Sequence, residues 1–246
     1  MTVPAAKAER ARAVMIELFP EGFEEVDHEG GVELAAYTDP AGEERLWAAF
    51  GGARSDSVEE GWEDRWRAFH RPARIGPLWV GPPWEEPDAG AIAIVIDPGR
   101  AFGTGSHATT RLCLELLLEV PAGSLLDIGC GSGVLAIAAA KLGFDPVRAV
   151  DLDPQAIEAT TRNAEANGVA VEAELGDALE SPLPASDCAV VNVAVDLDRR
   201  IAQRLECTRL ITSGYLLSEL PDLAGYRRDA RREAEGWAAD LHIRTQ

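Results

Sequence analysis

A loop with three closely spaced glycines is the strongest chemical signal in this sequence. Gly129, Gly131 and Gly133 alternate with other residues directly after an apolar run, and Asp127 stands two residues before the first of them. Glycines at this spacing let the backbone pass close to a ligand at the C-terminal edge of a sheet. A dinucleotide-binding loop would have its third glycine where Val134 stands, and the sequence contains no Gly-Lys-Ser or Gly-Lys-Thr phosphate loop. The pattern therefore indicates a cofactor site, weakens the case for NAD and excludes a kinase-type P-loop.

An acidic residue follows this loop at the spacing expected of a nucleoside site. Asp151 ends the apolar run Val147–Asp151 and stands twenty residues after Gly131. A carboxylate at the end of such a strand can accept two hydrogen bonds from the diol of a ribose. Together, the glycine loop, the strand end and the acid predict a site for a cofactor that contains a nucleoside.

The elements that position these residues alternate between strand and helix from Ala91 onward. This alternation predicts a parallel sheet whose strands are joined by crossover helices. We expect strands over Ile92–Ile96, Leu125–Ile128, Val147–Asp151, Val169–Leu175, Cys188–Val193, Arg209–Ser213 and Ala239–Arg244. We expect one helix with its apolar residues between Leu112 and Val120, another over Val134–Leu142, and a third from Pro154, with Asp153 as its N-cap, to Asn167.

The first quarter of the chain predicts a small α+β module. A helix is expected over Pro4–Leu18, a hairpin over Phe23–Thr38 and a second helix over Glu43–Phe50. A stretch rich in tryptophan and proline follows, and its aromatic side chains either hold the module against the larger domain or line a substrate entrance. The predicted division is a module over residues 1–57, a connector over 58–90 and a cofactor-binding domain over 91–246.

These motifs make the sequence resemble class I S-adenosylmethionine-dependent methyltransferases, whose hallmark loop is D-x-G-x-G-x-G. It is similar in particular to the PrmA family, bacterial enzymes that methylate large-subunit ribosomal protein eleven. Three further segments carry this closer resemblance: the block Asp97–Thr110, which reads D-P-G-R-A-F-G-T-G-S-H-A-T-T, the pair Trp62 and Trp66, and the run Val190–Val193. The resemblance implies a Rossmann-like α/β fold with a mostly parallel, doubly wound sheet and a small N-terminal α+β module that selects the substrate.

The resemblance also carries functional residues onto this sequence. It implies contacts to S-adenosylmethionine from Phe102, Gly105, Thr110, Gly129, Gly131, Gly133, Asp151 and Asn192. Asn192, at the expected end of a strand, can orient both the cofactor and an incoming amine, which makes it a candidate catalytic residue. His107 is the other candidate, either as a proton acceptor or as a structural hydrogen-bonding group that holds its loop. The remaining histidines, His28, His70 and His242, are expected to be ordinary surface or connector residues.

Charge and cysteine content limit the partners of the chain. Its 246 residues contain 42 acidic and 23 basic side chains, a formal net charge of −19. Such a surface repels phosphate backbones, which argues against direct nucleic-acid binding and favours a basic protein or a cationic small molecule. The four cysteines are scattered, without the spacing of a zinc site or a disulfide framework, and we expect no metal. We expect no signal peptide or membrane span, so the predicted location is the cytoplasm.

The function expected from these features is S-adenosylmethionine-dependent N-methylation of amino groups, on a lysine or an N-terminal amine, of a ribosomal protein. The alternatives are a methyltransferase for a small-molecule amine or hydroxyl, and a non-catalytic module that only binds S-adenosylmethionine. One part of the sequence departs from the family, whose recognition domain begins with a β-strand. Here only Thr2 and Val3 precede the expected helix at Pro4, so we expect a trimmed or rearranged recognition module.

Overall fold

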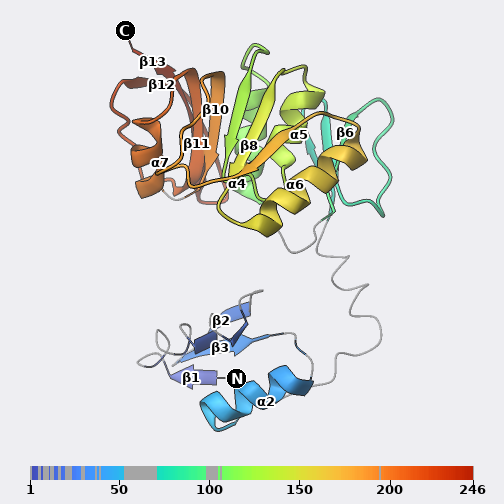
Figure 1. The fold of residues 1–246 in the computed structure, drawn as a ribbon, viewed down its shortest axis with the longest axis vertical. Coiled ribbons are helices and arrows are strands. Elements are labelled where there is room, and N and C mark those ends of the chain that lie inside the picture. Colours follow the sequence, from blue (N-terminus) through green and yellow to red (C-terminus); the bar gives the residue numbers. More distant parts are fainter. Residues whose placement is uncertain are drawn as a thin grey trace. The chain divides into compact units, whose positions relative to one another are not determined.

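The chain divides into two compact units, Met1–Glu63 and Asp64–Gln246 (Figure 1). The computed structural model describes residues 2–4, 7, 11, 14–15, 18–19, 24–28, 31–36, 38, 40–52, 71–97, 105, 107–193 and 195–245. The predicted boundary between residues 57 and 58 lies outside this range, and residues 71–90 of the predicted connector belong to the larger unit. In the described part of the chain, no helix has both the length and the apolar character that crossing a membrane requires.

The smaller unit contains a three-stranded antiparallel sheet and a helix. Its strands are β1 (Thr2–Pro4), β2 (Glu24–His28) and β3 (Gly31–Ala35), in the order β1-β3-β2. The register, with Val26 opposite Glu33, confirms the predicted hairpin. Helix α2 (Pro40–Phe50) follows and starts three residues earlier than predicted.

The expectation that a helix begins at Pro4 is wrong at that residue. Pro4 is the last residue of β1, which pairs with β3 so that Val3 lies opposite Val32. A three-residue strand carries no periodic pattern, and only its pairing with β3 reveals it. Val3 also buries its side chain in the apolar cluster of this unit. Most of the predicted helix over Pro4–Leu18 lies outside the described residues.

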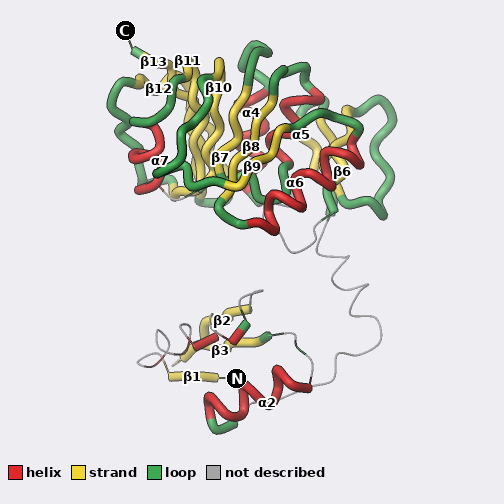
Figure 2. The backbone as a smooth tube through the Cα atoms, viewed as in Figure 1, coloured by secondary structure: helices red, strands yellow, loops and turns green. Residues whose placement is uncertain are grey.

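The larger unit is built around a seven-stranded sheet with the order β12-β13-β11-β10-β7-β8-β9, drawn as yellow strands in Figure 2. Its strands are β7 (Leu125–Ile128), β8 (Val147–Asp151), β9 (Glu172–Leu175), β10 (Ser186–Asn192), β11 (Cys207–Leu216), β12 (Tyr226–Ala234) and β13 (Trp237–Arg244). The five strands from β11 to β9 are parallel, whereas β13 pairs antiparallel with β11, and β12 with β13. The predicted α/β fold with a mostly parallel sheet is confirmed.

The sequence does not predict three of the strands in this unit. Two of them, β4 (Ala73–Ile75) and β5 (Leu78–Gly81), form a second sheet with the predicted strand β6 (Ile92–Val95). Both are very short and lie where a connector is expected. The third, β12, is an edge strand dominated by arginine and acidic residues, which protects the edge but hides the strand pattern.

Four helices of the larger unit are described: α4 (Ala108–Leu117), α5 (Val134–Lys141), α6 (Pro154–Asn167) and α7 (Val195–Ala202). The predicted ends of α6 are confirmed. The Asp153 side chain accepts a hydrogen bond from the Gln155 N–H at 2.8 Å, and Gly168 ends the helix in the left-handed conformation with a φ of 65°. The sequence does not predict α7, in which half of the eight residues are charged.

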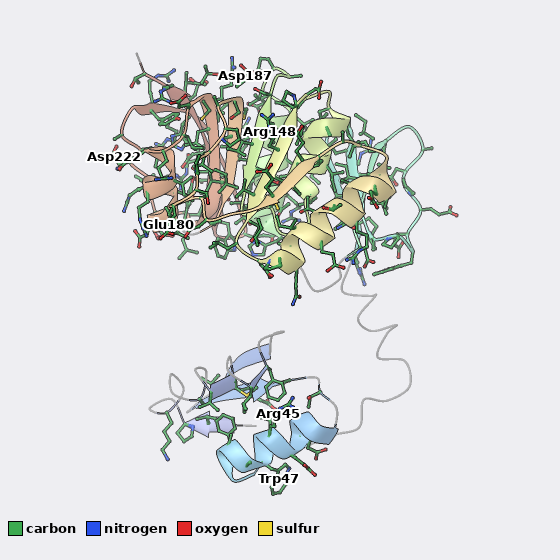
Figure 3. The ribbon with its side chains drawn as sticks, viewed as in Figure 1. Arg45, Trp47, Arg148, Glu180, Asp187 and Asp222 are labelled. Carbon is green, nitrogen blue, oxygen red and sulfur yellow. The ribbon has the colours of Figure 1, made fainter. Side chains whose placement is uncertain are left out.

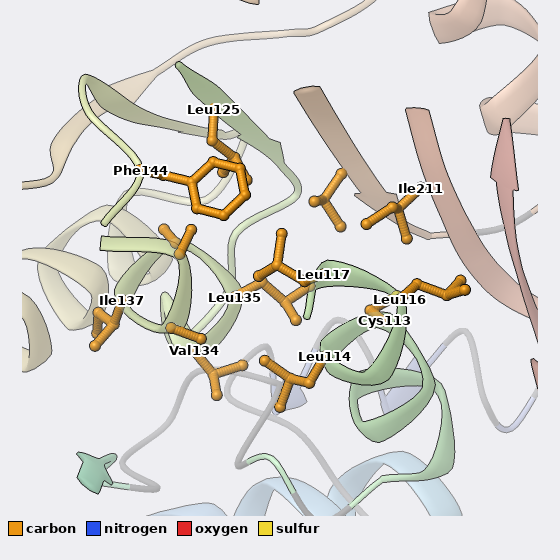
Figure 4. Packing of buried hydrophobic residues seen from close by; sticks show 14 of the residues in the cluster. Cys113, Leu114, Leu116, Leu117, Leu125, Val134, Leu135, Ile137, Phe144 and Ile211 are labelled. Carbon is orange, nitrogen blue, oxygen red and sulfur yellow. The ribbon is translucent and has the colours of Figure 1, made fainter. Parts of the chain in front are cut away.

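Apolar clusters cover both faces of the larger sheet. On one face, α4 and α5 pack against Leu125 and Ile211 (Figure 4). On the other, Ile201 of α7 joins a cluster with Leu126 and Leu210. Consecutive strand residues therefore point into different clusters, which explains why these strands read as continuous apolar runs in the sequence.

Candidate functional site

Three neighbouring parallel strands end together at the C-terminal edge of the larger sheet. In the register of the sheet, Ile128 of β7 lies opposite Val191 of β10 on one side and Val150 of β8 on the other. The glycine loop after β7, Asp151 at the end of β8 and Asn192 at the end of β10 therefore meet at one edge. Ligands of open α/β sheets bind at this edge, so the structure brings the predicted loop, acid and amide together.

The loop after β7 requires glycine at its alternating positions. Gly129, Gly131 and Gly133 have φ angles of 73°, 54° and 82°, in the left-handed region that L side chains rarely adopt. A Cβ atom added to Gly129 would lie 2.8 Å from Val193 Cγ1, and one added to Gly133 would lie 2.9 Å from the Thr160 side chain. The loop runs straight into the N-terminus of α5, where free backbone N–H groups favour an anionic group.

Asp151 joins the loop to the end of β8. Its Oδ2 accepts a hydrogen bond from the Gly131 N–H at 2.9 Å, and its Oδ1 accepts one from the Asp153 N–H at 3.0 Å. An ionised carboxylate offers about four lone-pair directions. Lone pairs therefore remain on both oxygens for the two hydroxyls of a ribose, in the position that the sequence spacing predicts.

A second acid, Asp127, lies buried at the end of β7. Its Oδ2 accepts a hydrogen bond from the Ala136 N–H at 3.1 Å, while its Oδ1 has no hydrogen-bond partner among the described residues. Burial raises the pKa of this carboxyl to about 7. Burial therefore favours the protonated form of this carboxyl directly before the glycine loop.

Asn192 lies next to the glycine loop at the end of β10. It is half-buried, and in the sheet it lies opposite Ser213 of β11. The next residue, Val193, is the one that a side chain at Gly129 would contact. This close approach brings the Asn192 backbone to the same end of the loop as Gly129.

At the other end of β10, Asp187 (Figure 3) accepts hydrogen bonds from the Ser124 N–H and hydroxyl and joins β10 to the start of β7.

The start of α4 is capped by His107. The His107 Nδ1 accepts a hydrogen bond from the Thr109 N–H at 3.4 Å and lies 2.8 Å from the Thr109 hydroxyl oxygen. The imidazole ring also contacts Trp237 edge to face, with 5.1 Å between the ring centroids. This geometry makes His107 the N-cap of α4, while its two predicted roles, holding the preceding loop and accepting a proton, stay predictions. Thr110, in the first turn of α4, is buried.

Gly105 is positioned beside the start of α5. Its φ is 87°, and a Cβ atom added to it would collide with Val80 Cγ1 and would lie 3.7 Å from Val134 Cγ2. Gly105 therefore lies close to the residue that follows Gly133. Phe102, the other residue predicted for this part of the site, lies outside the described residues. The contacts of all these residues with a cofactor remain predictions.

One histidine prediction is wrong. His242, expected at the surface, is a buried residue of β13 whose Nε2 lies 3.1 Å from the Thr212 hydroxyl oxygen. Burial is the main cause that lowers its pKa to about 4, so the ring is neutral at physiological pH. It belongs to a buried polar network in which Tyr215 donates a hydrogen bond to Asp240 at 2.9 Å, and Asp240 also pairs with Arg231 at 3.0 Å.

Sequence reasoning also missed polar residues that are buried by tertiary packing. Thr160 and Asn163 of α6 hold the glycine loop through the carbonyl oxygens of Gly131 and Ser132. Asp198 of α7 is fully buried, and neither of its carboxyl oxygens has a hydrogen-bond partner among the described residues. The only sequence signal for these residues is their polar type at helical positions. The sequence alone does not show whether such positions face the core or the solvent.

The fold and the site define a class of protein. A seven-stranded, mostly parallel sheet with a glycine loop after β7 and an acid after β8 is the class I methyltransferase fold. A solved structure of a ribosomal protein L11 methylase from Lactobacillus delbrueckii subsp. bulgaricus shares this fold. Its TM-score is 0.64 at 28% sequence identity, over 72% of this chain and 100% of that one.

Within this class, the chain belongs to the ribosomal protein L11 methyltransferase (PrmA) family, whose family model matches residues 24–230. This membership confirms the resemblance found in the sequence. The chain is 40% identical over 202 residues to the ribosomal protein L11 methyltransferase of Symbiobacterium thermophilum, covering 76% of this chain and 66% of that one. It is also 40% identical over 181 residues to the protein of that name from Vibrio campbellii, covering 70% and 61%. The chain thus spans just under two thirds of the length of these relatives.

Proposed function

We propose that this chain is an S-adenosylmethionine-dependent N-methyltransferase that modifies amino groups of a protein, on a lysine or an N-terminal amine. Ribosomal protein L11 is its first candidate substrate, because the family and the relatives above carry that name. A ribosomal substrate would place the protein in the cytoplasm.

The observation that best supports this proposal is the fixed position of Asp151 beside the glycine loop. Its carboxylate is oriented by the Gly131 and Asp153 N–H groups and retains lone pairs for a ribose diol. The loop itself leaves no room for side chains at Gly129 and Gly133. These features fit S-adenosylmethionine, whose adenosine carries such a diol. Without side chains at these glycines, the loop backbone can come close to the rest of the cofactor.

The chain's own groups would bind and align the reactants. When bound, the cofactor supplies a methyl group already activated by its positive sulfur. Asp151 would accept hydrogen bonds from the ribose hydroxyls. The first turn of α4, which contains Thr110, would bind the carboxylate of the methionine end. Asn192 would orient the attacking nitrogen. Alignment of this kind can contribute about 7–11 kcal/mol to lowering the barrier, so a dedicated general base is not required.

The charge of the chain supports a cationic substrate. With a net charge of −19, the protein attracts a basic partner and repels a free phosphate backbone. An exposed lysine on a basic protein fits such a site. As a cation it is attracted by the negative charge, and when it loses its proton it becomes a nucleophile. The same charge also suits a cationic small molecule, which is the alternative substrate class.

The test is methyl transfer to purified ribosomal protein L11, followed by intact-mass spectrometry. We expect mass increases of one or more methyl groups with the unaltered chain and a large loss of transfer with Asn192→Ala. Transfer to small amines but not to L11 would favour the alternative substrate class. Binding of S-adenosylmethionine without transfer to any acceptor would favour a non-catalytic binding module.

A further inference from the structure

One face of α6 carries a row of buried polar side chains. Thr160, Asn163 and Asn167 follow one another at helical spacing and are 0%, 1% and 9% exposed. The side of a helix that faces a core is normally apolar, and buried polar groups are costly unless they form hydrogen bonds. The partners of this row therefore show what it does.

The N-terminal part of the row holds the carbonyl side of the glycine loop. The Thr160 hydroxyl donates to the Gly131 carbonyl oxygen at 3.1 Å, and Asn163 Nδ2 donates to the Ser132 carbonyl oxygen at 2.9 Å. Because Asp151 accepts from the Gly131 N–H, the Gly131 residue is held through both its N–H and its carbonyl group.

The C-terminal part of the row holds the end of β6. Asn167 Oδ1 accepts from the Val95 N–H at 2.9 Å, and Asn167 Nδ2 donates to the Val95 carbonyl oxygen at 2.6 Å. Asn163 Oδ1 accepts from the Asp97 N–H at 3.2 Å. Asn163 is thus the member of the row whose single amide group connects the glycine loop to the strand that precedes Gly105 and α4.

We propose that Asn163 is a positioning residue for the cofactor, acting through the glycine loop rather than by contact with the ligand. The inference rests on the proposed function. A loop with three glycines in the left-handed region has many conformations open to it, and hydrogen bonds from neighbouring elements help to select the one that fits a ligand. A loop that is already held in this conformation binds more tightly, because less ordering remains to be done on binding.

The experiment compares Asn163→Ala with Asn167→Ala in the full-length chain. Each variant removes a buried asparagine from the same helix face, but only Asn163 contacts the glycine loop. The probe is S-adenosylhomocysteine, measured by calorimetry, together with thermal unfolding and hydrogen exchange of the amides in residues 129–136. We expect Asn163→Ala to raise the dissociation constant about tenfold, the effect of roughly one lost hydrogen bond, and to speed exchange in the loop. Asn167→Ala should lower the melting temperature about as much as Asn163→Ala does. It should leave the dissociation constant within about twofold of that of the unaltered chain.

A conservative variant covers the case in which Asn163→Ala does not fold. Asn163→Asp keeps the acceptor for the Asp97 N–H and, in its ionised form, has no donor for Ser132, so it too should raise the dissociation constant, and more strongly as the pH rises. At saturating cofactor, the turnover number should stay close to that of the unaltered chain, because Asn163 contacts neither reactant. Equal dissociation constants in the unaltered chain and both Asn163 variants would overturn the inference and leave the proposed function standing. Failure of the unaltered chain itself to bind S-adenosylhomocysteine would overturn the proposed function, and the inference with it.

Discussion

Single residues at the C-terminal edge of the sheet combine structural and binding roles. Asp151 accepts hydrogen bonds from two backbone N–H groups and still offers lone pairs to a ligand. Asp127 joins β7 to α5 through one oxygen and leaves the other without a partner among the described residues. At this scale the site is an arrangement of backbone donors and carboxylates. Its behaviour should therefore depend on single hydrogen bonds and on the protonation of single carboxyl groups.

Replacing Asp151 tests the cofactor site most directly. We expect Asp151→Ala to weaken S-adenosylmethionine binding by about 1.5–3 kcal/mol, because hydrogen bonds to a charged group are lost. Calorimetry measures the affinity, and NADH should not bind at comparable concentrations. Glu165→Ala, which removes an exposed carboxylate from α6, is the control for the change in net charge and should leave affinity unchanged. Unchanged affinity in Asp151→Ala would remove Asp151 from the site.

Asp198 predicts a pH dependence of stability. Burial raises its pKa to about 8 in the folded chain, whereas an unfolded aspartate has a pKa of about 3.9. Between these values the folded state keeps a proton that the unfolded state has lost. The contribution of Asp198 to stability is therefore fully present below about pH 4 and is lost as the pH rises to about 8, by at most about 1.4 kcal/mol per pH unit.

The variant that tests this is Asp198→Asn, which cannot titrate. Urea unfolding at about pH 5 and about pH 7.5 gives the free energy of unfolding of both proteins. Relative to the unaltered chain, the variant should be more stable at the higher pH than at the lower one. Asp127, whose pKa is also raised, contributes equally to both proteins and cancels in the comparison. Parallel stability curves for the two proteins would contradict the prediction.

At the scale of elements, α6 joins the parts of the site. Its N-cap Asp153 follows Asp151 by two residues, its buried polar row holds the glycine loop and β6, and its side chains occupy the space beside Gly133. The glycine loop is therefore shaped by a helix more than twenty residues further along the chain. A substitution in the loop that disturbs its packing against α6 should therefore change the stability of the larger unit.

Gly133→Ala and Gly143→Ala separate backbone strain from collision. Both glycines have φ angles in the left-handed region, 82° and 91°, so each alanine variant should cost about 1–2 kcal/mol of stability. At Gly143 a Cβ atom has no neighbour within 4 Å, whereas at Gly133 it lies 2.9 Å from Thr160. Chemical denaturation should show a larger loss for Gly133→Ala, with weaker S-adenosylhomocysteine binding in that variant alone. Equal losses in the two variants would show that the loop accommodates the added methyl group.

At the scale of the whole molecule, each of the two units has an apolar core of its own. The larger unit contains both apolar clusters of the sheet and every described residue assigned to the cofactor site. The smaller unit has its own sheet and its own apolar cluster. On the basis of this separation, we propose, as the resemblance in the sequence implies, that the smaller unit selects the substrate while the larger one binds the cofactor.

Removing residues 1–57 tests this division. The shortened chain should unfold cooperatively and bind S-adenosylmethionine with near-native affinity, because the cofactor residues and their supporting core are retained. It should lose most methylation of ribosomal protein L11, measured by intact-mass spectrometry. If it methylates L11 as fast as the full chain, recognition lies in the larger unit.

The sequence by itself determined the features that depend on local patterns. The glycines at 129, 131 and 133, the acid at 151 and the cap at Asp153 mark their structures through residue type and short spacing, and all lie where they are expected. The apolar runs of β7 and β8 are predicted to the residue, because strands buried on both faces need no alternation to be recognised.

Only the tertiary structure decided the features that depend on distant partners. β1, β4 and β5 are too short to carry a pattern, and they exist as strands because neighbouring strands pair with them. The burial of His242 and Asp198, and the partners of Asn163, likewise depend on elements far away in the sequence. The physical reason is that a polar side chain has the same local sequence signal whether it faces water or a buried carbonyl group, and long-range packing alone chooses between the two.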